Sequence, residues 1–193
     1  MNTTSKTLKS SPGKEVFPPW GKLKGGSSTE GALTSKYFTL RELTRSAAAL
    51  RHKLDNTPDA AAVASLQALV THVLDPLRQL YGAPIMVTSG YRSPAVNAAV
   101  GGAAHSQHLL GEAADITTGS PEGNRRLLGL ILGPLPAPPR GREGGGDLAP
   151  LGEIKRGLPF DQLIAEECDA KGNPGWIHIS YSDKNRNQVL YDL

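Results

Sequence analysis

The sequence predicts an α+β fold in which helices pack on a small antiparallel sheet, and two kinds of signal support this prediction. Helix starts, marked by Ser or Thr followed by Pro or by Glu three residues later, lie mainly in the first two thirds of the chain. Short runs rich in apolar and β-branched residues, typical of strands, dominate the C-terminal part. At 193 residues the chain fits one domain with a single hydrophobic core.

The first helices are predicted from their caps. Thr39-Leu40-Arg41-Glu42 forms a capping box, and the helix after it should run to about Arg51. Thr57-Pro58 should open a second helix with Thr57 as the N-cap. Pro76 should kink this helix and Gly82 should end it. The apolar stripe of the second helix consists of Val63, Leu66, Val70, Val73, Leu74, Leu77 and Leu80.

The remaining elements follow the same signals. Two further helices should start at the Ser-Pro pairs 93–94 and 120–121. Strands are expected at 85–89, 112–116, 160–166, 176–181 and, at the sheet edge, 189–191.

Two stretches should lie outside the packed domain. Residues 1–34 are rich in Ser, Thr, Lys, Gly and Pro without apolar periodicity, which is typical of a disordered tail. Residues 133–158, with their Gly-Pro and Gly-Gly-Gly runs, predict a low-complexity insert. We therefore expect a single domain over 35–193 that carries this insert.

Composition excludes several classes of protein. The net charge of +3 comes from scattered Lys and Arg, so we expect no nucleic-acid partner. The sequence contains no run of 18 apolar residues and no apolar stretch after the N-terminal lysines, so we expect neither a membrane span nor a secretory signal. Cys168 is the only cysteine, which excludes an intrachain disulfide. We expect a monomer.

The segment 106–115 holds the first candidate site residues. His108 and Asp115 lie seven residues apart, with Gly111 between them, a spacing that suits a loop ligand, a sharp turn and a strand ligand. His178 lies in an apolar strand, where an unpaired ring is costly. Two imidazoles and one carboxylate can hold a divalent metal and leave a position open for water. Taken singly, each residue also fits an ordinary loop or core role.

A non-haem iron site uses the same types of ligand. In such sites the first His and the carboxylate usually lie two residues apart on one strand. The gap of seven between His108 and Asp115 argues against this alternative.

Several motifs together resemble a known family. They are Ser-x-His-x-x-Gly-x-Ala-x-Asp at 106–115, Ser-Gly-Tyr-Arg-Ser at 89–93, Phe-Asp-Gln-Leu-Ile at 160–164 and Trp-x-His at 176–178. In this order they resemble the D-alanyl-D-alanine carboxypeptidase family of zinc peptidases, which also includes D-Ala-D-Ala dipeptidases and phage endolysin L-alanyl-D-glutamate peptidases. The resemblance covers residues 36–193 apart from the insert.

The resemblance implies a hedgehog/D-Ala-D-Ala peptidase-like fold and one zinc ion bound by His108, Asp115 and His178. It also implies that Arg92 points into the site, where a guanidinium can hold a substrate carboxylate or a developing oxyanion. A surface salt bridge is the alternative for Arg92. Ser106 either binds near the metal or caps the turn.

The general base is less clear, because many relatives carry an acidic residue three positions before the last histidine and this chain has Gly175 there. The candidates are Glu166, Glu167 and Asp161. Strand alternation puts Asp161 and Glu167 on one face and Glu166 on the other. The resemblance favours Glu166, since relatives carry an acidic residue at this place.

The expected function is zinc-dependent hydrolysis of a peptide bond in peptidoglycan stem peptides, as a carboxypeptidase or an endolysin-type endopeptidase. The bond cut, and a role in lysis or in wall upkeep, stay open. The protein would reach the cell wall by phage-type release or by another export route. The alternative is an inactive, zinc-containing wall-binding or phage structural domain. His52, His72 and His105 are expected to be ordinary exposed or helical histidines.

Overall fold

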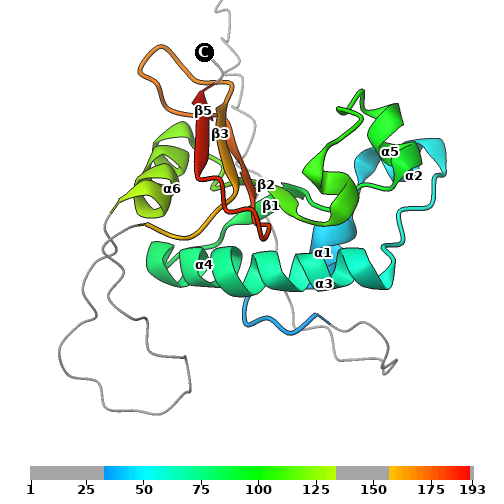
Figure 1. Ribbon diagram of the computed structural model, residues 1–193. Coiled ribbons are helices and arrows are strands. Elements are labelled where there is room, and N and C mark those ends of the chain that lie inside the picture. The colour runs from blue at the N-terminus through cyan, green and yellow to red at the C-terminus, as the bar shows by residue number, and fades with distance from the viewer. Residues whose placement is uncertain (1–32, 134–156, 192–193) are drawn as a thin grey trace, which may run out of the picture. The chain divides into compact units, whose positions relative to one another are not determined.

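The computed structural model describes residues 33–133 and 157–191, which form a five-stranded sheet with helices packed against it (Figure 1). These residues lie in one compact unit, Gly31–Leu193. The α+β fold class is thereby confirmed. The elements are α1 (Leu40–Thr44), α2 (Ala47–His52), α3 (Ala60–Leu69), the π-helical turn η1 (Val70–Leu74), α4 (Asp75–Tyr81), β1 (Met86–Ser89), α5 (Pro94–Ala99), the 3-10 helix η2 (Gln107–Leu110), β2 (Ala113–Thr117), α6 (Pro121–Leu132), β3 (Gln162–Glu166), β4 (Trp176–Ser180) and β5 (Gln188–Tyr191).

The sheet has the strand order β1-β2-β4-β3-β5 and is mixed. The first three neighbouring pairs are antiparallel, as predicted, but β5 runs parallel to β3, so the prediction of a wholly antiparallel sheet is wrong at this edge. β4 ends where β3 begins, since the Asp161 N–H donates to Ser180 O at 2.8 Å. After β4 the chain is therefore already near the start of β3. β5 begins there, on the side of β3 that β4 does not occupy, and so runs in the same direction as β3.

The two faces of the sheet differ in chemistry. One face packs into the core, and its fully buried residues are Ala114, Ile116, Leu163, Ala165, Ile177 and Ile179. Because side chains alternate along a strand, Asp115 and His178 lie on the opposite face. The sheet therefore supports a polar site with one face and anchors it to the core with the other.

The helix formed by α3, η1 and α4 runs as one rod past the sheet (Figure 1). Its N-cap is Asp59, whose Oδ1 accepts from Ala62 N at 2.8 Å, so the predicted cap at Thr57 is wrong. Thr57 instead donates its hydroxyl and its backbone N–H to Asp55 Oδ1, at 2.6 Å and 2.9 Å. Asp55 closes a local turn around Thr57, and the next residue with a capping side chain starts the helix.

Pro76 was predicted to kink the helix, and the structure has a π-helical turn directly before it. The Asp75 N–H donates to Val70 O, five residues earlier, directly before the proline. Proline has no N–H and its ring crowds the carbonyl one turn back, and a widened turn accommodates both effects. Gly82 ends the helix with a φ of 75°, as predicted.

The continuous helix Ala60–Tyr81 has 22 residues and a hydropathy of 1.3, and within the described ranges it alone is long and apolar enough to cross a membrane. Six of its side chains are fully buried in the core, namely Leu66, Leu69, Val70, Val73, Leu74 and Leu77. Packing against the sheet accounts for its apolar composition, as in the core helix of a globular domain.

The other predicted caps are present, but the first predicted helix is divided into two. Thr39 and Glu42 form the capping box of α1. The helix expected to continue to Arg51 is interrupted, because Ser46 starts α2 by accepting from Ala49 N at 3.2 Å. The Ser-Pro starts of α5 and α6 are confirmed.

The predicted tail and insert lie mostly outside the described residues. Where described residues border them, the chain contacts the domain. Leu33 packs on the core, and Thr34 exchanges two hydrogen bonds with Gln67, at 2.7 Å and 2.8 Å. Leu158 is buried, and its N–H donates to Ile131 O at 3.0 Å. These edge residues belong to the packed domain.

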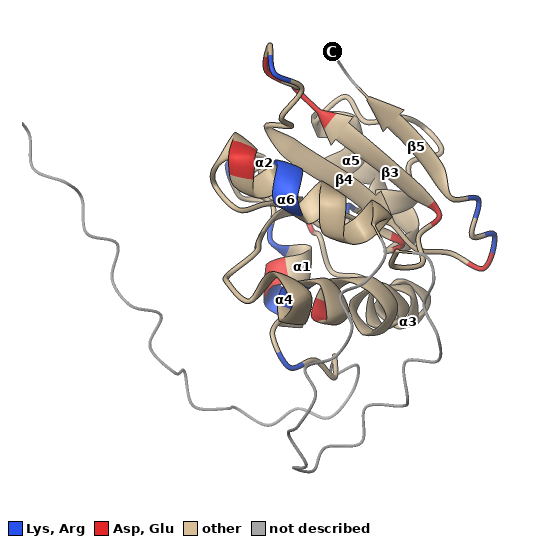
Figure 2. Ribbon diagram, turned by 90° about the vertical axis from the view of Figure 1, so that its left-hand side faces the viewer, with Lys and Arg blue, Asp and Glu red and all other residues tan. Residues whose placement is uncertain are grey.

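Charged residues are interspersed over the described elements. Figure 2 shows basic and acidic positions scattered over several helices and loops. No single element in the part of the chain seen there carries a continuous basic stripe.

Candidate metal centre

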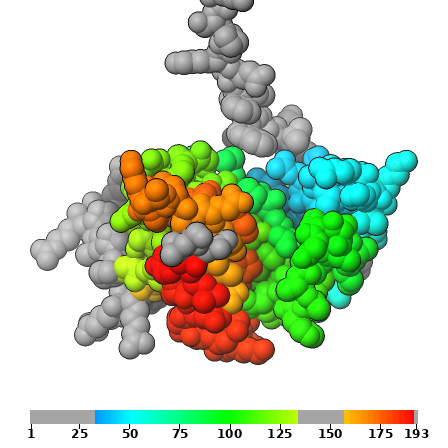
Figure 3. All heavy atoms as spheres, turned by 90° about the horizontal axis from the view of Figure 1, so that it is seen from above, coloured from blue at the N-terminus to red at the C-terminus, as the bar shows by residue number. Residues whose placement is uncertain are grey.

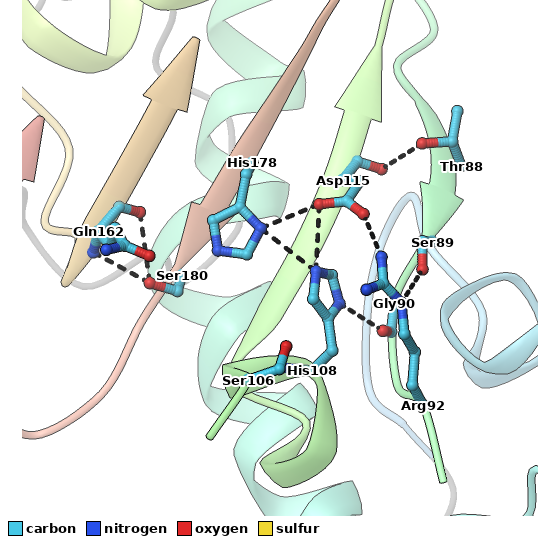
Figure 4. Close-up of polar contacts among 10 residues, drawn as sticks. All are labelled: Thr88, Ser89, Gly90, Arg92, Ser106, His108, Asp115, Gln162, His178 and Ser180. Atoms are coloured by element: carbon cyan, nitrogen blue, oxygen red, sulfur yellow. Dashed lines mark hydrogen bonds and ion pairs between the residues drawn. The ribbon is translucent and has the colours of Figure 1, made fainter. Parts of the chain in front are cut away.

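Three side chains from three elements meet on the polar face of the sheet. His108 lies in η2, Asp115 in β2 and His178 in β4, and they point toward one another (Figure 4). His108 Nε2 lies 3.1 Å from Asp115 Oδ1 and 3.2 Å from His178 Nδ1, and the last two atoms are 2.9 Å apart. All three residues are buried. Among residues 33–133 and 157–191 they are the one group of this kind placed to hold a metal ion.

The pairing of β2 with β4 brings two of the three together. Asp115 stands directly opposite His178 in the antiparallel register, so both side chains leave the sheet on the same face. The third side chain, His108, comes from a short segment directly before β2. That segment is η2, whose C-terminal residue leads into β2 through Gly111.

Gly111 makes the sharp turn that the sequence predicts. Its φ is 72°, a conformation that glycine adopts without strain. A Cβ at this position would also overlap the carbonyl oxygen of Ala62 in α3. The turn is thus fixed by both backbone conformation and close packing, and it sets the distance between His108 and Asp115.

The protonation of the two rings decides what can lie between them. His108 Nδ1 is 2.7 Å from Gly90 O, which can only accept, so Nδ1 carries the proton. In the neutral ring, Nε2 then presents a lone pair toward Asp115 Oδ1, which is also an acceptor. The three contacts cannot all be hydrogen bonds, whereas a cation would satisfy all three atoms.

The separations also fit a metal ion. Tetrahedral zinc with bonds of about 2.0–2.1 Å separates neighbouring ligand atoms by roughly 3.3 Å. The three distances of 2.9–3.2 Å between His108, Asp115 and His178 lie close to this value. Both the donor chemistry and the spacing therefore fit one metal ion.

Arg92 holds the second oxygen of the Asp115 carboxylate. Its Nη2 donates to Asp115 Oδ2 at 2.6 Å, and its Nε donates to Ser89 Oγ at 2.8 Å (Figure 4). This pair is largely buried, unlike the surface salt bridge considered from sequence. A second partner on a ligating carboxylate fixes its orientation and leaves Oδ1 directed at the histidines. The contact with Asp115 was not anticipated.

The charge state of Asp115 follows from these surroundings. Burial alone raises the pKa of its carboxyl, but the contacts with His108 and His178 outweigh burial and hold this pKa well below its usual range. Asp115 is therefore a carboxylate at neutral pH, as a metal ligand must be.

Ser106 caps the helix that carries His108. Its Oγ accepts from the His108 N–H at 3.4 Å, in agreement with one of the two roles expected for it. Ser106 also lines the cavity beside the three groups. Exposed His105 lies on the same rim.

The three candidate bases have different surroundings. Glu166 lines the same cavity as Asp115 and His178, and it lies on their face of the sheet because it pairs with Trp176 on β4. Glu167 leaves the strand with a φ of 49° and does not line this cavity.

Asp161, the third candidate base, is fully buried and fully engaged. Its carboxylate accepts from Arg186 Nε at 2.9 Å, from Arg186 Nη2 at 2.7 Å and from Gln107 Nε2 at 2.8 Å. The hydrogen bonds from Arg186 hold the pKa of this carboxyl well below its usual range. Such a group is a structural anion rather than a proton acceptor.

Gly175, where many relatives carry an acidic residue, belongs to the tight connection before β4. Its N–H is shared between the carbonyl oxygens of Glu166, at 2.9 Å, and Glu167, at 3.2 Å. A Cβ here would lie 3.3 Å from Glu167 Cβ, which is tighter than an ordinary contact. A side chain at position 175 would therefore require Glu167 to shift by a few tenths of an ångström.

The cavity over the three groups has a volume of about 360 Å³. Of its lining residues, Arg92, Ser106 and Glu166 were predicted from the sequence as site residues, whereas Gln107, Trp176 and Arg186 were not. The proximity of Gln107 to His108 was a usable signal. Arg186 gave none, because its contact with the site depends on the path of the chain between β4 and β5.

The other histidines and the cysteine have ordinary surroundings. His52 and His72 are exposed, and the His72 ring stacks on Tyr181 with 4.7 Å between centroids. Cys168 is half-buried, and its thiol donates to Ala165 O at 3.6 Å.

Comparison with known proteins gives two matches. The family described as Peptidase M15 matches residues 36–128, a range that contains Arg92, His108 and Asp115 but neither Glu166 nor His178. The zinc D-Ala-D-Ala carboxypeptidase of Streptomyces albus G is 46% identical over 63 residues, which cover 32% of this chain. The match covers 25% of that relative, so the chain aligns with about a quarter of its length.

Proposed function

Because residues 36–128 match the peptidase M15 family, we propose that the chain is a zinc-dependent peptidase whose site is the group His108, Asp115 and His178. The observation that carries the proposal is the convergence of three lone-pair donors on one point, with Asp115 fixed from behind by Arg92. The matched range contains His108 and Asp115, and His178 joins them in the structure.

Zinc would be held by His108 Nε2, Asp115 Oδ1 and His178 Nδ1. Bound there, it would supply a Lewis acid for the scissile carbonyl and lower the pKa of a bound water toward about 7. The hydrogen bond from His108 Nδ1 to Gly90 O fixes the tautomer that such binding requires.

Glu166 is proposed as the general base. It would take a proton from the attacking water and pass it to the leaving amine. Its support is its position, because of the three candidate acids it alone lines the cavity on the same face as Asp115 and His178.

Arg92 is proposed to act on the substrate as well as on Asp115. Two of its nitrogens bind Ser89 and Asp115, while Nη1 binds no other residue in the described ranges. Arg92 lines the cavity, where this remaining nitrogen could bind a substrate carbonyl or carboxylate oxygen.

The proposed substrates are peptidoglycan stem peptides, cut by a carboxypeptidase or by an endolysin-type endopeptidase. The named activity of the Streptomyces relative supports the first type of bond, D-Ala-D-Ala. The protein would act on the cell wall as a monomer, after phage-type release or another form of export.

An inactive zinc-containing wall-binding or phage structural domain is the second candidate. It is favoured by Gly175, which occupies the position where many relatives carry an acidic residue. If Glu166 does not replace that acid, the site would hold zinc without cutting peptides.

One experiment separates these functions. Purified full-length protein would be incubated with soluble muropeptides, with zinc and then with chelator, and the products identified by mass spectrometry. We expect one new peptide fragment with zinc, none with chelator and none with His108→Ala. A wild-type protein that binds one zinc and wall fragments but yields no product would favour the inactive domain, and full cleavage by His108→Ala would overturn the zinc assignment.

A further inference from the structure

Arg186 lies in the loop between β4 and β5, where two cavities meet. It lines the cavity over the metal group and also a second cavity of about 350 Å³. The two cavities share His105, Ser106, Gln107 and Arg186. The two cavities are therefore adjacent, and Arg186 borders both.

The position of Arg186 follows from two parts of the chain that lie close together. Figure 3 shows the C-terminal strand residues beside the segment around residues 94–110, which contains η2. Asp161, directly before β3, connects them: it accepts from Gln107 of η2 at 2.8 Å and from Arg186 Nη2 at 2.7 Å. Arg186 therefore lies close to both η2, which carries His108, and the start of β3.

Asp161 fixes the conformation of Arg186. The fully buried carboxylate accepts from Nε, Nη2 and the backbone N–H of Arg186, at 2.9 Å, 2.7 Å and 2.9 Å. The flanking residues Asn185 and Asn187 have φ values of 40° and 52°, a left-handed conformation that bends the loop around this contact. The guanidinium is thus held in a single orientation.

The guanidinium also keeps one edge available. Its side chain is 47% exposed, and Nη1 binds no other residue within residues 33–133 and 157–191. Arg186 lines both cavities rather than bulk solvent alone. A fixed, partly exposed guanidinium is well suited to bind a carboxylate.

We propose that Arg186 binds a carboxylate of the peptide substrate and so extends the substrate site from the metal group into the second cavity. The proposal rests on the proposed peptidase function. Lys184 adds a second cation to the second cavity, and Glu112, an acid there, accepts from Gln107 Nε2 at 3.2 Å. Glu112 also interacts electrostatically with Arg186, so the substrate carboxylate is expected at the Nη1 edge, which neither Asp161 nor Gln107 binds.

Two carboxylates of a stem peptide have this chemistry. One is the C-terminal carboxylate, and the other is the free α-carboxylate of a D-Glu that is linked through its γ-carboxyl. Both present two oxygens to a guanidinium edge. Replacing each in turn by its amide changes the charge with almost no change in shape, so a test can separate them.

The test measures binding of acetyl-L-Ala-γ-D-Glu-L-Lys-D-Ala-D-Ala and its two single amides to the zinc-loaded full-length chain. Glu166→Gln prevents turnover, and Trp20→Phe leaves Trp176, which lines the cavity, as the only tryptophan to report binding by fluorescence. We expect one of the two amides to raise Kd roughly tenfold, the usual size of a charge-assisted hydrogen bond that is partly exposed to solvent. Adding Arg186→Gln should raise Kd for the acid by a similar factor and abolish discrimination against that amide.

Two controls separate this role from folding. Arg51→Gln makes the same change at an exposed position that lines neither cavity and should leave all three Kd values unchanged. Asp161→Asn combined with Arg186→Gln removes the buried anion together with its partner and should also lose the discrimination. Both variants would be checked for bound zinc and for Tm.

The outcomes distinguish this proposal from the peptidase assignment. Equal Kd values for the acid and both amides, or no binding at all, would overturn the role of Arg186. If the chain with Glu166 intact cleaves all three peptides with equal kcat/KM, the peptidase function stands and the role of Arg186 does not. Charge-dependent binding without any cleavage would support the role of Arg186 and overturn the peptidase function.

Discussion

Glu166 and Glu167 are neighbours in the sequence with different surroundings. Glu166 lines the cavity beside His178, whereas Glu167 does not. If Glu166 is the general base, Glu166→Gln should lower kcat by about 10²- to 10⁴-fold, because the amide cannot take the proton. Steady-state peptide cleavage would measure this loss.

Glu167→Gln is the matched control for this prediction, since it makes the same change one residue away. We expect kcat to stay within about twofold of the wild type, as is usual for a group that contributes less than about 0.5 kcal/mol. Zinc content should be unchanged in both variants. An undiminished kcat in Glu166→Gln would remove Glu166 from the mechanism.

Asp161 should make the stability of the domain depend on pH. Its pKa is held below its ordinary value of 3.8, chiefly by the hydrogen bonds from Arg186. A carboxyl with a lowered folded-state pKa stabilises the fold above its unfolded-state pKa and loses this contribution as the pH falls. Asp161→Asn should therefore be less stable than the wild type at neutral pH, and the difference should shrink below pH about 4.

Urea unfolding of both proteins between pH 7 and pH 3 would test this dependence. Comparing the two curves removes the contribution of Asp115, whose pKa is also lowered and which both proteins share. A stability difference that stays constant over the whole range would mean that Asp161 does not stabilise the fold through its charge.

At the scale of elements, the turn from η2 to β2 sets the geometry of two ligands. Gly111 and Gly82 both have positive φ, 72° and 75°, but a Cβ at Gly111 would overlap Ala62 O while one at Gly82 would meet open space. Gly82→Ala should cost roughly 1 kcal/mol from backbone conformation alone. Gly111→Ala should cost roughly 3 kcal/mol, because overpacking adds to it.

Denaturant unfolding of the two glycine variants would measure these costs. Gly111→Ala should also weaken zinc binding, since it shifts His108 relative to Asp115, whereas Gly82→Ala should leave zinc affinity unchanged. Equal costs for the two substitutions would mean that η2 does not pack tightly against α3 at Gly111.

Local signals predicted most of the elements, and long-range contacts account for what they missed. The Ser-Pro starts of α5 and α6 were found because a cap acts within three residues. The cap at Thr57 was wrong because Asp55 and Asp59 compete for the same turn, and the sequence does not rank them. The parallel direction of β5 depends on where β4 ends in space, which no local pattern encodes.

In the candidate site, too, local signals predicted some residues and long-range contacts determine the others. His108 and Asp115 were found from a short motif, and His178 from the cost of an imidazole in an apolar strand. The contact of Arg92 with Asp115 and the pairing of Arg186 with Asp161 join residues 23 and 25 positions apart in the sequence. Only the sheet register and the loop between β4 and β5 bring them together.

For the molecule as a whole, the metal centre links η2, β2 and β4. A metal that binds only the folded state stabilises it by mass action, by about 4 kcal/mol when its free concentration is a thousand times Kd. For a chain of this size, that amounts to a rise in Tm of roughly 10 °C.

Thermal unfolding with zinc and with chelator would measure this coupling. We expect the rise in the wild type and none in Asp115→Ala, which removes the shared ligand between the two histidines. A Tm that responds equally to zinc in both proteins would place the ion elsewhere.

The central claim is that one zinc ion, held by His108, Asp115 and His178, enables peptide cleavage. Its most direct test is the rate of cleavage as zinc is added stepwise to the metal-free full-length chain. We expect a linear rise that stops at one zinc per chain, and no rise in His178→Ala. A rate that is independent of zinc, or a His178→Ala protein that gains activity with the same stoichiometry, would contradict it.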